Sequence, residues 1–217
     1  LPLSEDTPAD DLLIAQHVMA TLDEGAVPLA LGGDHAVSLP LIEAVARRHG
    51  PVSVLHIDAH PDCYDDFEGN PRSHASPFAR LAERGCLSRL MQVGIRTMND
   101  QCAAQVQRFG FEVVPMLPFR PEAVPVLTGP LYISIDLDGI DPSEAPGVNH
   151  PEPGGLTVRE LLALLHRQTA PIVGVDIVEL NPQRDVNGVT AILAAKLVRE
   201  CAALIHRNTP SPPESAS

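Results

Sequence analysis

The sequence predicts a three-layer α/β/α domain in which a mainly parallel sheet lies between two layers of helices. The chain has 217 residues, a length that suits one large domain. Short, continuously apolar runs alternate along it with segments of helical periodicity. Strands that are apolar at every position are typical of a parallel sheet covered on both faces. In such sheets the ligand site lies at the carboxyl ends of the strands.

Six apolar runs indicate the strands of this sheet, of which the fourth is the weakest. They cover residues 27–31, 52–57, 90–93, 112–115, 131–137 and 172–178. Acidic motifs stand where several of these runs end, so the rule for parallel sheets places those motifs at the ligand-binding edge.

Four helices are indicated by capping signals at their starts and by an apolar stripe along their length. They are expected from Thr7 to Leu22, from Ser76 to about Gly85, from the capping box Thr157–Glu160 to His166, and from Thr190 onward. We expect a single catalytic domain over residues 1–207. Residues 208–217 are rich in Ser and Pro and are expected to be a disordered tail.

Charge and composition exclude several classes of partner. The formal net charge is −13, whereas nucleic acid and anionic membrane surfaces need clustered Lys and Arg. No apolar run approaches the length of a transmembrane helix, and the first residues do not form a signal peptide. The four cysteines lack metal-finger spacing, so we expect reduced thiols in a cytoplasmic protein.

Three segments that follow predicted strands carry the groups suited to bind metal. Their sequences are LGGDH at 31–35, HIDAHPD at 56–62 and SIDLDGIDP at 134–142. Strand side chains alternate between the two faces, so Asp58, His60 and Asp62 are expected to converge on one side. Asp136 and Asp138 are expected to do the same on a neighbouring strand.

Carboxylates gathered in this way repel one another, and a cation relieves the repulsion. Together with His35, the set holds four carboxylates and two imidazoles, which suits two metal ions that share bridging carboxylates. Oxygen-rich ligands with some nitrogen and no sulfur favour Mn²⁺, with Fe²⁺, Co²⁺ or Zn²⁺ as alternatives.

Each segment alone also has a structural interpretation without metal. The Asp-x-His-x-Asp segment could be a solvated turn, Asp136 and Asp138 could cap a helix, and His35 could be a hydrogen-bonded core histidine. The occurrence of all three at strand ends favours the metal site.

Further motifs surround these segments in a fixed order. They are SHASP at 73–77, APG at 145–147, PGG at 153–155 and VDIVELNP at 175–182. With GGDH at 32–35 and DAHPD at 58–62, they make the chain resemble the ureohydrolase family, which includes arginase, agmatinase and guanidinobutyrase. The resemblance runs from about residue 31 to about residue 207. The stretch 65–78 and NPQRD at 181–185 resemble most the plant-type arginase/agmatinase branch.

The resemblance implies an arginase-like fold with two Mn²⁺ ions per subunit and hydrolysis of a guanidino compound to urea and an amine. One ion would be held by His35, Asp58, Asp62 and Asp136, the other by Asp58, His60, Asp136 and Asp138. His74 stands at the position of a proton-shuttling histidine, and Glu179 at that of the carboxylate that binds the guanidinium. Asn70 and His150 are further candidates for substrate contacts. Asp176 is expected to support the metal ligands without binding metal itself. The family also forms homo-oligomers, trimers or hexamers.

Two features differ from the family pattern. Family members carry an additional α/β unit before the GGDH motif, and only about one helix precedes it here, so part of the N-terminal unit is expected to be missing. The loop that begins with YDDFE at 64–68 is acidic, where common arginases carry a polar loop that binds the α-carboxylate of the substrate. An acidic loop repels a carboxylate and accepts an amine, which favours agmatine, hydrolysed to putrescine.

Other substrates and other classes of protein remain open. Asn70 or Arg72 could still meet a carboxylate, so arginine, hydrolysed to ornithine, and 4-guanidinobutyrate are the alternative substrates. A zinc deacetylase would need a His-His dyad, which the sequence lacks, and a two-metal phosphoesterase would need more basic groups near the motifs. A non-catalytic, truncated paralogue is the alternative from a different class.

Overall fold

The protein is described by a computed structural model that covers residues 1, 7–114 and 116–208. The described strands form one six-stranded sheet in the order β1-β6-β5-β2-β3-β4, and every neighbouring pair is parallel. The strands are β1 (Leu29–Leu31), β2 (Val52–Ile57), β3 (Leu87–Val93), β4 (Glu112–Val114), β5 (Leu131–Asp136) and β6 (Ile172–Val178).

All six predicted strands are confirmed, with small differences at their ends. The strand predicted over 27–31 begins at Leu29, and the one predicted over 90–93 begins three residues earlier, at Leu87. The first three residues of β3 are partly exposed, so they lack the continuous apolar pattern of its buried end. Pro115, predicted as the end of the fourth strand, lies outside the described residues.

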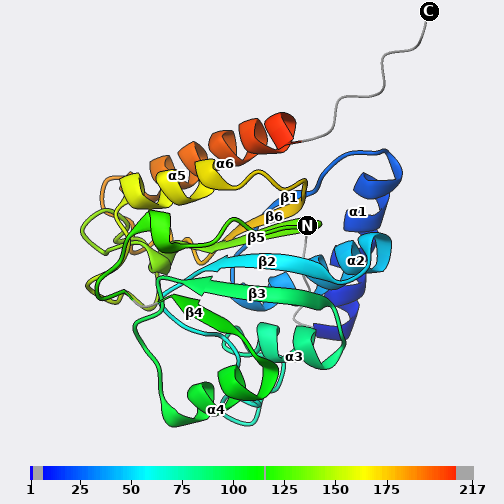
Figure 1. Cartoon of the computed structure of the whole chain (residues 1–217), viewed down its shortest axis with the longest axis horizontal. Helices are drawn as coiled ribbons and strands as arrows, with labels where there is room; N and C mark the ends of the chain where they lie inside the picture. Colours follow the sequence, from blue (N-terminus) through cyan, green and yellow to red (C-terminus); the bar gives the residue numbers. More distant parts are fainter. Residues whose placement is uncertain (2–6, 115, 209–217) are drawn as a thin grey trace, which may run out of the picture.

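Helices cover both faces of the sheet. They are α1 (Thr7–Asp23), α2 (Ser38–His49), α3 (Pro77–Glu83), α4 (Asp100–Phe109), α5 (Val158–Arg167) and α6 (Val189–Asn208), with 3-10 turns η1 (His35–Val37), η2 (Pro121–Ala123) and η3 (Leu137–Gly139). Figure 1 shows α5 and α6 together on one side of the sheet and α1 to α4 on the other. The predicted three-layer α/β/α architecture is therefore confirmed.

Four of these helices confirm the predicted ones, while α2 and α4 are additional. In α5 the predicted capping box is present, with Thr157 and Glu160 each accepting from the other's backbone N–H. Helix α4 begins after Asn99, whose side chain caps Cys102 N, and ends at Gly110 in the left-handed conformation. Helix α6 ends at Asn208, the first residue of the predicted tail. Residues 209–217 lie outside the described part, so the tail stays a prediction.

The core consists of two layers, one on each face of the sheet. In β2, Leu55 and Ile57 pack toward α5 and α6, whereas Val52 and Val54 pack toward α1 to α4. This alternation follows from the two-residue period of a strand, and it explains why β2 is apolar throughout. No helix among the described residues is both long and apolar enough to cross a membrane.

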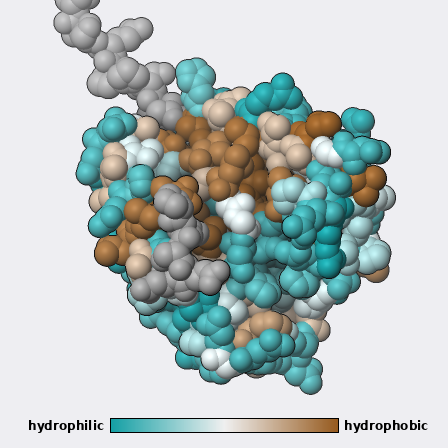
Figure 2. Space-filling view, turned by 180° about the vertical axis from the view of Figure 1, so that it is seen from behind, coloured by the Kyte–Doolittle hydropathy of each residue, from teal (hydrophilic) through white to brown (hydrophobic). Residues whose placement is uncertain are grey.

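Some large apolar side chains of the described residues are exposed. Strand β1 is an edge strand, and Leu31 at its end is 67% exposed. Ile192 of α6 is 70% exposed. Figure 2 shows apolar surface gathered in the upper half of the molecule when it is seen from behind.

Two substitutions in α6 test which face of the helix holds it to the sheet. Leu197 is fully buried, so Leu197→Ala is expected to lower the free energy of unfolding by about 2–5 kcal/mol, since it leaves a cavity. Ile192→Ala in the same helix should change it by less than about 0.5 kcal/mol. Urea denaturation of both variants measures this, and equal losses would contradict the packing described.

Candidate metal centre

The order of the strands explains why the candidate residues meet. Strands β1, β6, β5 and β2 are consecutive neighbours in the sheet. His35 follows β1 in η1, Glu179 follows β6, Asp136 ends β5 and Asp58 follows β2. Because all these strands are parallel, their carboxyl ends lie at one edge, and residues from distant parts of the chain converge there.

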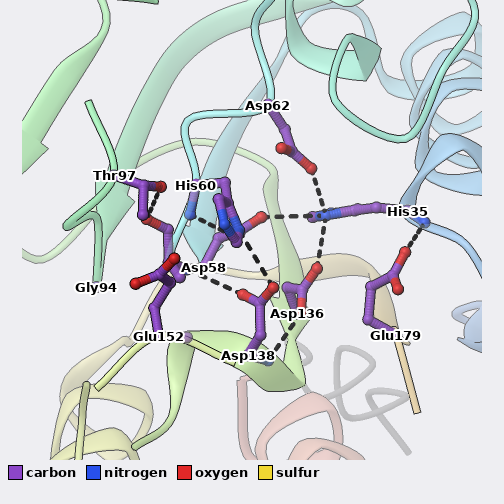
Figure 3. A network of polar contacts seen from close by, with 12 residues as sticks. His35, Asp58, His60, Asp62, Gly94, Thr97, Asp136, Asp138, Glu152 and Glu179 are labelled. Atoms are coloured by element: carbon purple, nitrogen blue, oxygen red, sulfur yellow. Dashed lines mark hydrogen bonds and ion pairs between the residues drawn. The ribbon is translucent and has the colours of Figure 1, made fainter. Parts of the chain in front are cut away.

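The first ligand group surrounds the buried ring of His35 (Figure 3). Its Nδ1 atom lies 3.1 Å from Asp58 Oδ2, 3.0 Å from Asp62 Oδ2 and 3.2 Å from Asp136 Oδ2. This nitrogen is buried and has no partner with hydrogen-bond geometry. One orphaned imidazole nitrogen facing three carboxylate oxygens fits a divalent cation of the Mn²⁺ type.

A second ligand group adjoins the first and shares Asp58 with it. His60 Nδ1 lies 3.3 Å from Asp58 Oδ1 and 3.2 Å from Asp138 Oδ2. The ligand atoms of these three residues lie within 4.8 Å of one another. Asp58 thus presents one oxygen to each group, as expected of a carboxylate that bridges two ions. The structure brings together all six residues that the sequence suggested as metal ligands.

Burial and the crowding of like charges raise the pKa values of three ligand carboxyls, those of Asp62, Asp136 and Asp138. Burial and repulsion from Asp58 raise the pKa of Asp62 to about 8 and that of Asp138 to about 6. Burial alone would lower the pKa of His60, but Asp138 and Asp58 outweigh it and raise that pKa to about 11. Protons therefore compensate the charge that a metal ion would compensate when bound.

Residues behind His35 fix its protonation pattern. Ser134 Oγ donates to Asp176 Oδ1 at 2.7 Å, so its oxygen accepts from His35 Nε2 at 3.0 Å. Tyr132 donates its hydroxyl proton to Asp176 Oδ2 at 2.8 Å. His35 Nε2 therefore carries a proton, and the neutral ring that a metal ion binds offers the lone pair of Nδ1. In the metal-free protein burial favours the neutral ring, but Asp136, Asp58 and Asp62 outweigh it and raise the pKa of His35 well above its usual value. The proton on Nδ1 is one that a metal ion would displace. Asp176 occupies the supporting position expected from the sequence.

A second chain of hydrogen bonds holds Asp58. Gln92 Nε2 donates to Pro61 O at 2.7 Å and to His56 Nδ1 at 3.0 Å, so His56 donates from Nε2 to Asp58 Oδ2 at 2.8 Å. Burial lowers the pKa of His56 to about 4, so this ring is neutral at pH 7. The roles of His56 and Gln92 were not predicted. The two-residue period of β2, which places His56 and Asp58 on the same face, is the signal that could have indicated the first of them.

A cavity of about 420 Å³ opens above the two ligand groups. His74, His150 and Glu179 line it, together with Tyr64 and Phe67. The rings of His74 and His150 are stacked, with centroids 5.4 Å apart and planes 12° apart. The two candidate histidines therefore form one wall of the cavity over the metal ligands.

Glu179 adopts an unusual backbone conformation beside this cavity. Its φ of 66° is in the left-handed region, which is costly for a residue with a side chain. The conformation is held by Glu179 N, which donates to Gly33 O at 2.7 Å, and by His35 N, which donates to Glu179 Oε1 at 2.8 Å. One carboxylate oxygen thus supports the turn that carries His35, and the side chain lies at the cavity wall.

Among the candidates for catalysis and substrate contact, which are His74, Glu179, His150 and Asn70, only Asn70 does not line this cavity. It lines a neighbouring hollow between α1 and the loop before α3, which also reaches His74. Its side-chain oxygen accepts from Arg72 N at 2.9 Å, a bond within its own turn. Its contact with a substrate stays a prediction.

Comparisons with known proteins agree with this fold and with the order of the motifs. The family model described as Arginase family matches residues 6–204. Arginase 1, mitochondrial, from Arabidopsis thaliana is 51% identical over 205 residues, which are 90% of this chain and 60% of that protein. Agmatinase, mitochondrial, from Gallus gallus is 41% identical over 192 residues, covering 81% of this chain and 56% of that protein.

A solved structure supports the same assignment. The arginase from Medicago truncatula superposes with a TM-score of 0.88 at 46% identity, covering 93% of this chain and 66% of that one. The chain spans about 60% of the length of the curated relatives it matches. Because the family model covers nearly the whole sequence and the fold agrees, the chain belongs to the arginase family.

Proposed function

We propose that this chain is a ureohydrolase that hydrolyses a small guanidino compound to urea and an amine and uses two Mn²⁺ ions. The observation that carries the proposal is the joining of two adjacent ligand groups through Asp58 beneath a cavity that Glu179 lines. Metal ligands and a carboxylate suited to a guanidinium thus face the same space.

The first ion would be held by His35, Asp58, Asp62 and Asp136, the second by Asp58, His60 and Asp138, with Asp136 as the further shared ligand expected from the family. Oxygen-rich ligands without sulfur favour Mn²⁺ over metals that prefer thiolates. When bound, the two ions would supply the Lewis acidity that makes a water molecule nucleophilic at neutral pH.

The chain's own residues would bind and protonate the substrate. A planar guanidinium fits a carboxylate through paired N–H donors, and Glu179 lies at the cavity wall to accept them. The departing amine needs a proton, and the His74 ring, which also lines the cavity, is the candidate donor. Burial and the nearby His74 lower the pKa of His150, so His150 stacks on His74 as a neutral ring.

The charges of the neighbouring hollow favour agmatine as the substrate. Arg72 at the neighbouring hollow is already paired with Asp11 and donates to Ala36 O, which leaves its guanidinium engaged. Acidic Asp34 and Glu68 line the same hollow. Acidic groups attract the amine of agmatine and repel the carboxylate of arginine or 4-guanidinobutyrate.

Arginine is the second candidate substrate. The observation that favours it is the 51% identity with a protein named Arginase 1. That relative is also named mitochondrial, so the cytoplasmic location expected from the cysteines stays a prediction. Assembly into a homotrimer or homohexamer likewise stays a prediction.

Metal binding is expected to depend on pH in a defined direction. In the metal-free protein the pKa values of Asp138 and Asp62 are raised to about 6 and about 8, above those of unfolded carboxyls. The native state therefore binds more protons than the unfolded state, and its stability falls as pH rises. Metal must displace these protons, so its affinity rises with pH.

The rise in Tm caused by Mn²⁺ should accordingly be larger at pH 8 than at pH 6, and binding at pH 7 should release protons. Differential scanning fluorimetry and calorimetry in buffers of different ionisation enthalpy measure both effects. Asp136→Asn serves as the control with a damaged first ligand group. A Tm rise that is the same at both pH values would contradict this scheme.

Urea release by the Mn²⁺-loaded protein tests the function itself. Agmatine, arginine and 4-guanidinobutyrate are compared at equal concentrations, with Asp136→Asn as the inactive control. We expect urea from agmatine above all. Preference for arginine would correct only the substrate, whereas no urea from any of them with two ions bound would refute the proposed reaction for these substrates.

Two substitutions separate binding from proton transfer. Glu179→Gln keeps the shape of the side chain but removes its charge, and should lower kcat/KM by roughly 10- to 100-fold. His74→Asn should lower kcat by about 10²- to 10⁴-fold with little change in KM, because it removes a proton donor. Steady-state kinetics of both variants, with metal content measured in parallel, distinguish these losses from loss of metal.

A further inference from the structure

We propose that Arg96 and Thr97 form a brace that positions the ligand group of Asp58, His60 and Asp138, and so controls one of the two metal ions separately from the other. The inference rests on the two-ion centre of the proposed function. Neither Arg96 nor Thr97 was among the residues that the sequence suggested. Both lie just after β3, and Figure 3 shows Gly94 and Thr97 beside the ligands.

The guanidinium of Arg96 is bound almost entirely by main-chain oxygens. Nη2 donates to Asp138 O at 2.8 Å and to Glu152 O, and Nε donates to Glu152 O at 3.0 Å. Nη1 donates to Gly94 O at 2.9 Å and to Gly139 O at 3.3 Å. One side chain thus joins the end of β3, the turn that contains Asp138, and the loop before α5.

The main chain next to Arg96 holds the other ligand loop. Three donors converge on Ala59 O: Arg96 N at 2.9 Å, Thr97 N at 3.2 Å and Thr97 Oγ1 at 2.9 Å. Ala59 stands between Asp58 and His60, and its own N–H donates to Asp138 Oδ1 at 3.1 Å. The brace therefore fixes both loops that carry the second ligand group relative to each other.

Close backbone packing leaves these loops no room for another arrangement. A Cβ at Gly94 would lie 2.6 Å from Asp58 O, and one at Gly139 would lie 2.7 Å from Asp58 N. A Cβ at Gly155 would lie 2.7 Å from Arg96 Nη2. Three glycines thus allow the braced segments to contact one another directly.

The contacts of Arg96 leave the ligand carboxylates free. Its half-buried guanidinium donates to main-chain carbonyls and to none of the ligand carboxylates. Asp138 Oδ2 consequently still faces His60 Nδ1, at 3.2 Å. Arg96 thus holds the backbone of the ligand loops without occupying the oxygens that would bind an ion.

The first ligand group has a different support. His35 is held by Ser134, Asp176 and Tyr132, which lie within β5 and β6. These residues and the brace have no member in common, and the two ligand groups meet at Asp58. Damage to one support should therefore weaken one ion more than the other.

The test is a titration of the metal-free protein with Mn²⁺ in the absence of substrate, with Arg96→Lys as the main variant. A lysine has one nitrogen and cannot reach this set of carbonyls. We expect one of the two dissociation constants to rise by about 10- to 100-fold and the other to change by less than about twofold. Arg89→Lys, in an exposed ion pair with Glu112, is the matched control and should change neither.

Electron paramagnetic resonance identifies which ion is lost. In Arg96→Lys at limiting Mn²⁺, the signal of the spin-coupled ion pair should be replaced by the spectrum of a single ion. That spectrum should match the spectrum of His60→Asn and differ from that of His35→Asn. Ser134→Ala should show the opposite pattern. If Arg96→Lys does not fold, Thr97→Val, which removes one donor to Ala59 O, should raise the same dissociation constant about 2- to 10-fold.

Equal weakening of both ions in these variants, or of neither, would overturn the brace while leaving the proposed function intact. Failure of the wild-type protein to produce urea although it binds two ions would overturn the function and not the brace. Binding of fewer than two ions by the wild-type protein would overturn both.

Discussion

The burial of four carboxylates beside two imidazoles at one edge of the sheet is the constraint on which the rest of this structure depends. Asp58 is fully buried, and the other three carboxylates are at most 5% exposed. Repulsion on this scale would open the edge unless protons or metal ions compensated it. The order β1-β6-β5-β2 is what makes the arrangement possible, since the ends of four adjacent strands each bring at least one functional residue to the same place.

Hydrogen bonds from neighbouring residues fix the position of the ligands that the strand order brings together. Neutral histidines need a defined proton position to act as ligands, and the Ser134–Asp176 pair supplies it for His35. Asp138 is positioned in another way, because Arg96 donates to Asp138 O and so fixes the backbone of its loop. The functional groups thus lie at the ends of strands, and their position is set by residues that are not themselves metal ligands.

Much of this arrangement could be predicted because it follows from local periodicity. The apolar runs predicted the six strands. The convergence of Asp58, His60 and Asp62 was also predicted, but for a wrong reason, because β2 ends at Ile57 and these residues lie in the loop after it, where Asp62 has a φ of 45°. Helix α4 was equally predictable from Asn99 and Gly110, whereas α2 carries Pro40 in its first turn, which resembles a break in a helix. The contacts of Arg96 could not be predicted, since they join loops that are far apart in sequence. The position of Asn70 depends on the folding of its loop, for which the sequence has no period.

The left-handed backbone of Glu179 has a consequence for what can replace this residue. Among the twenty residue types, glycine would adopt this φ with least cost. A glycine would, however, lose the bond that Glu179 Oε1 accepts from His35 N. The same side chain therefore links the wall of the cavity to the turn of the first ligand group, and a substitution that relieves the backbone would loosen that turn.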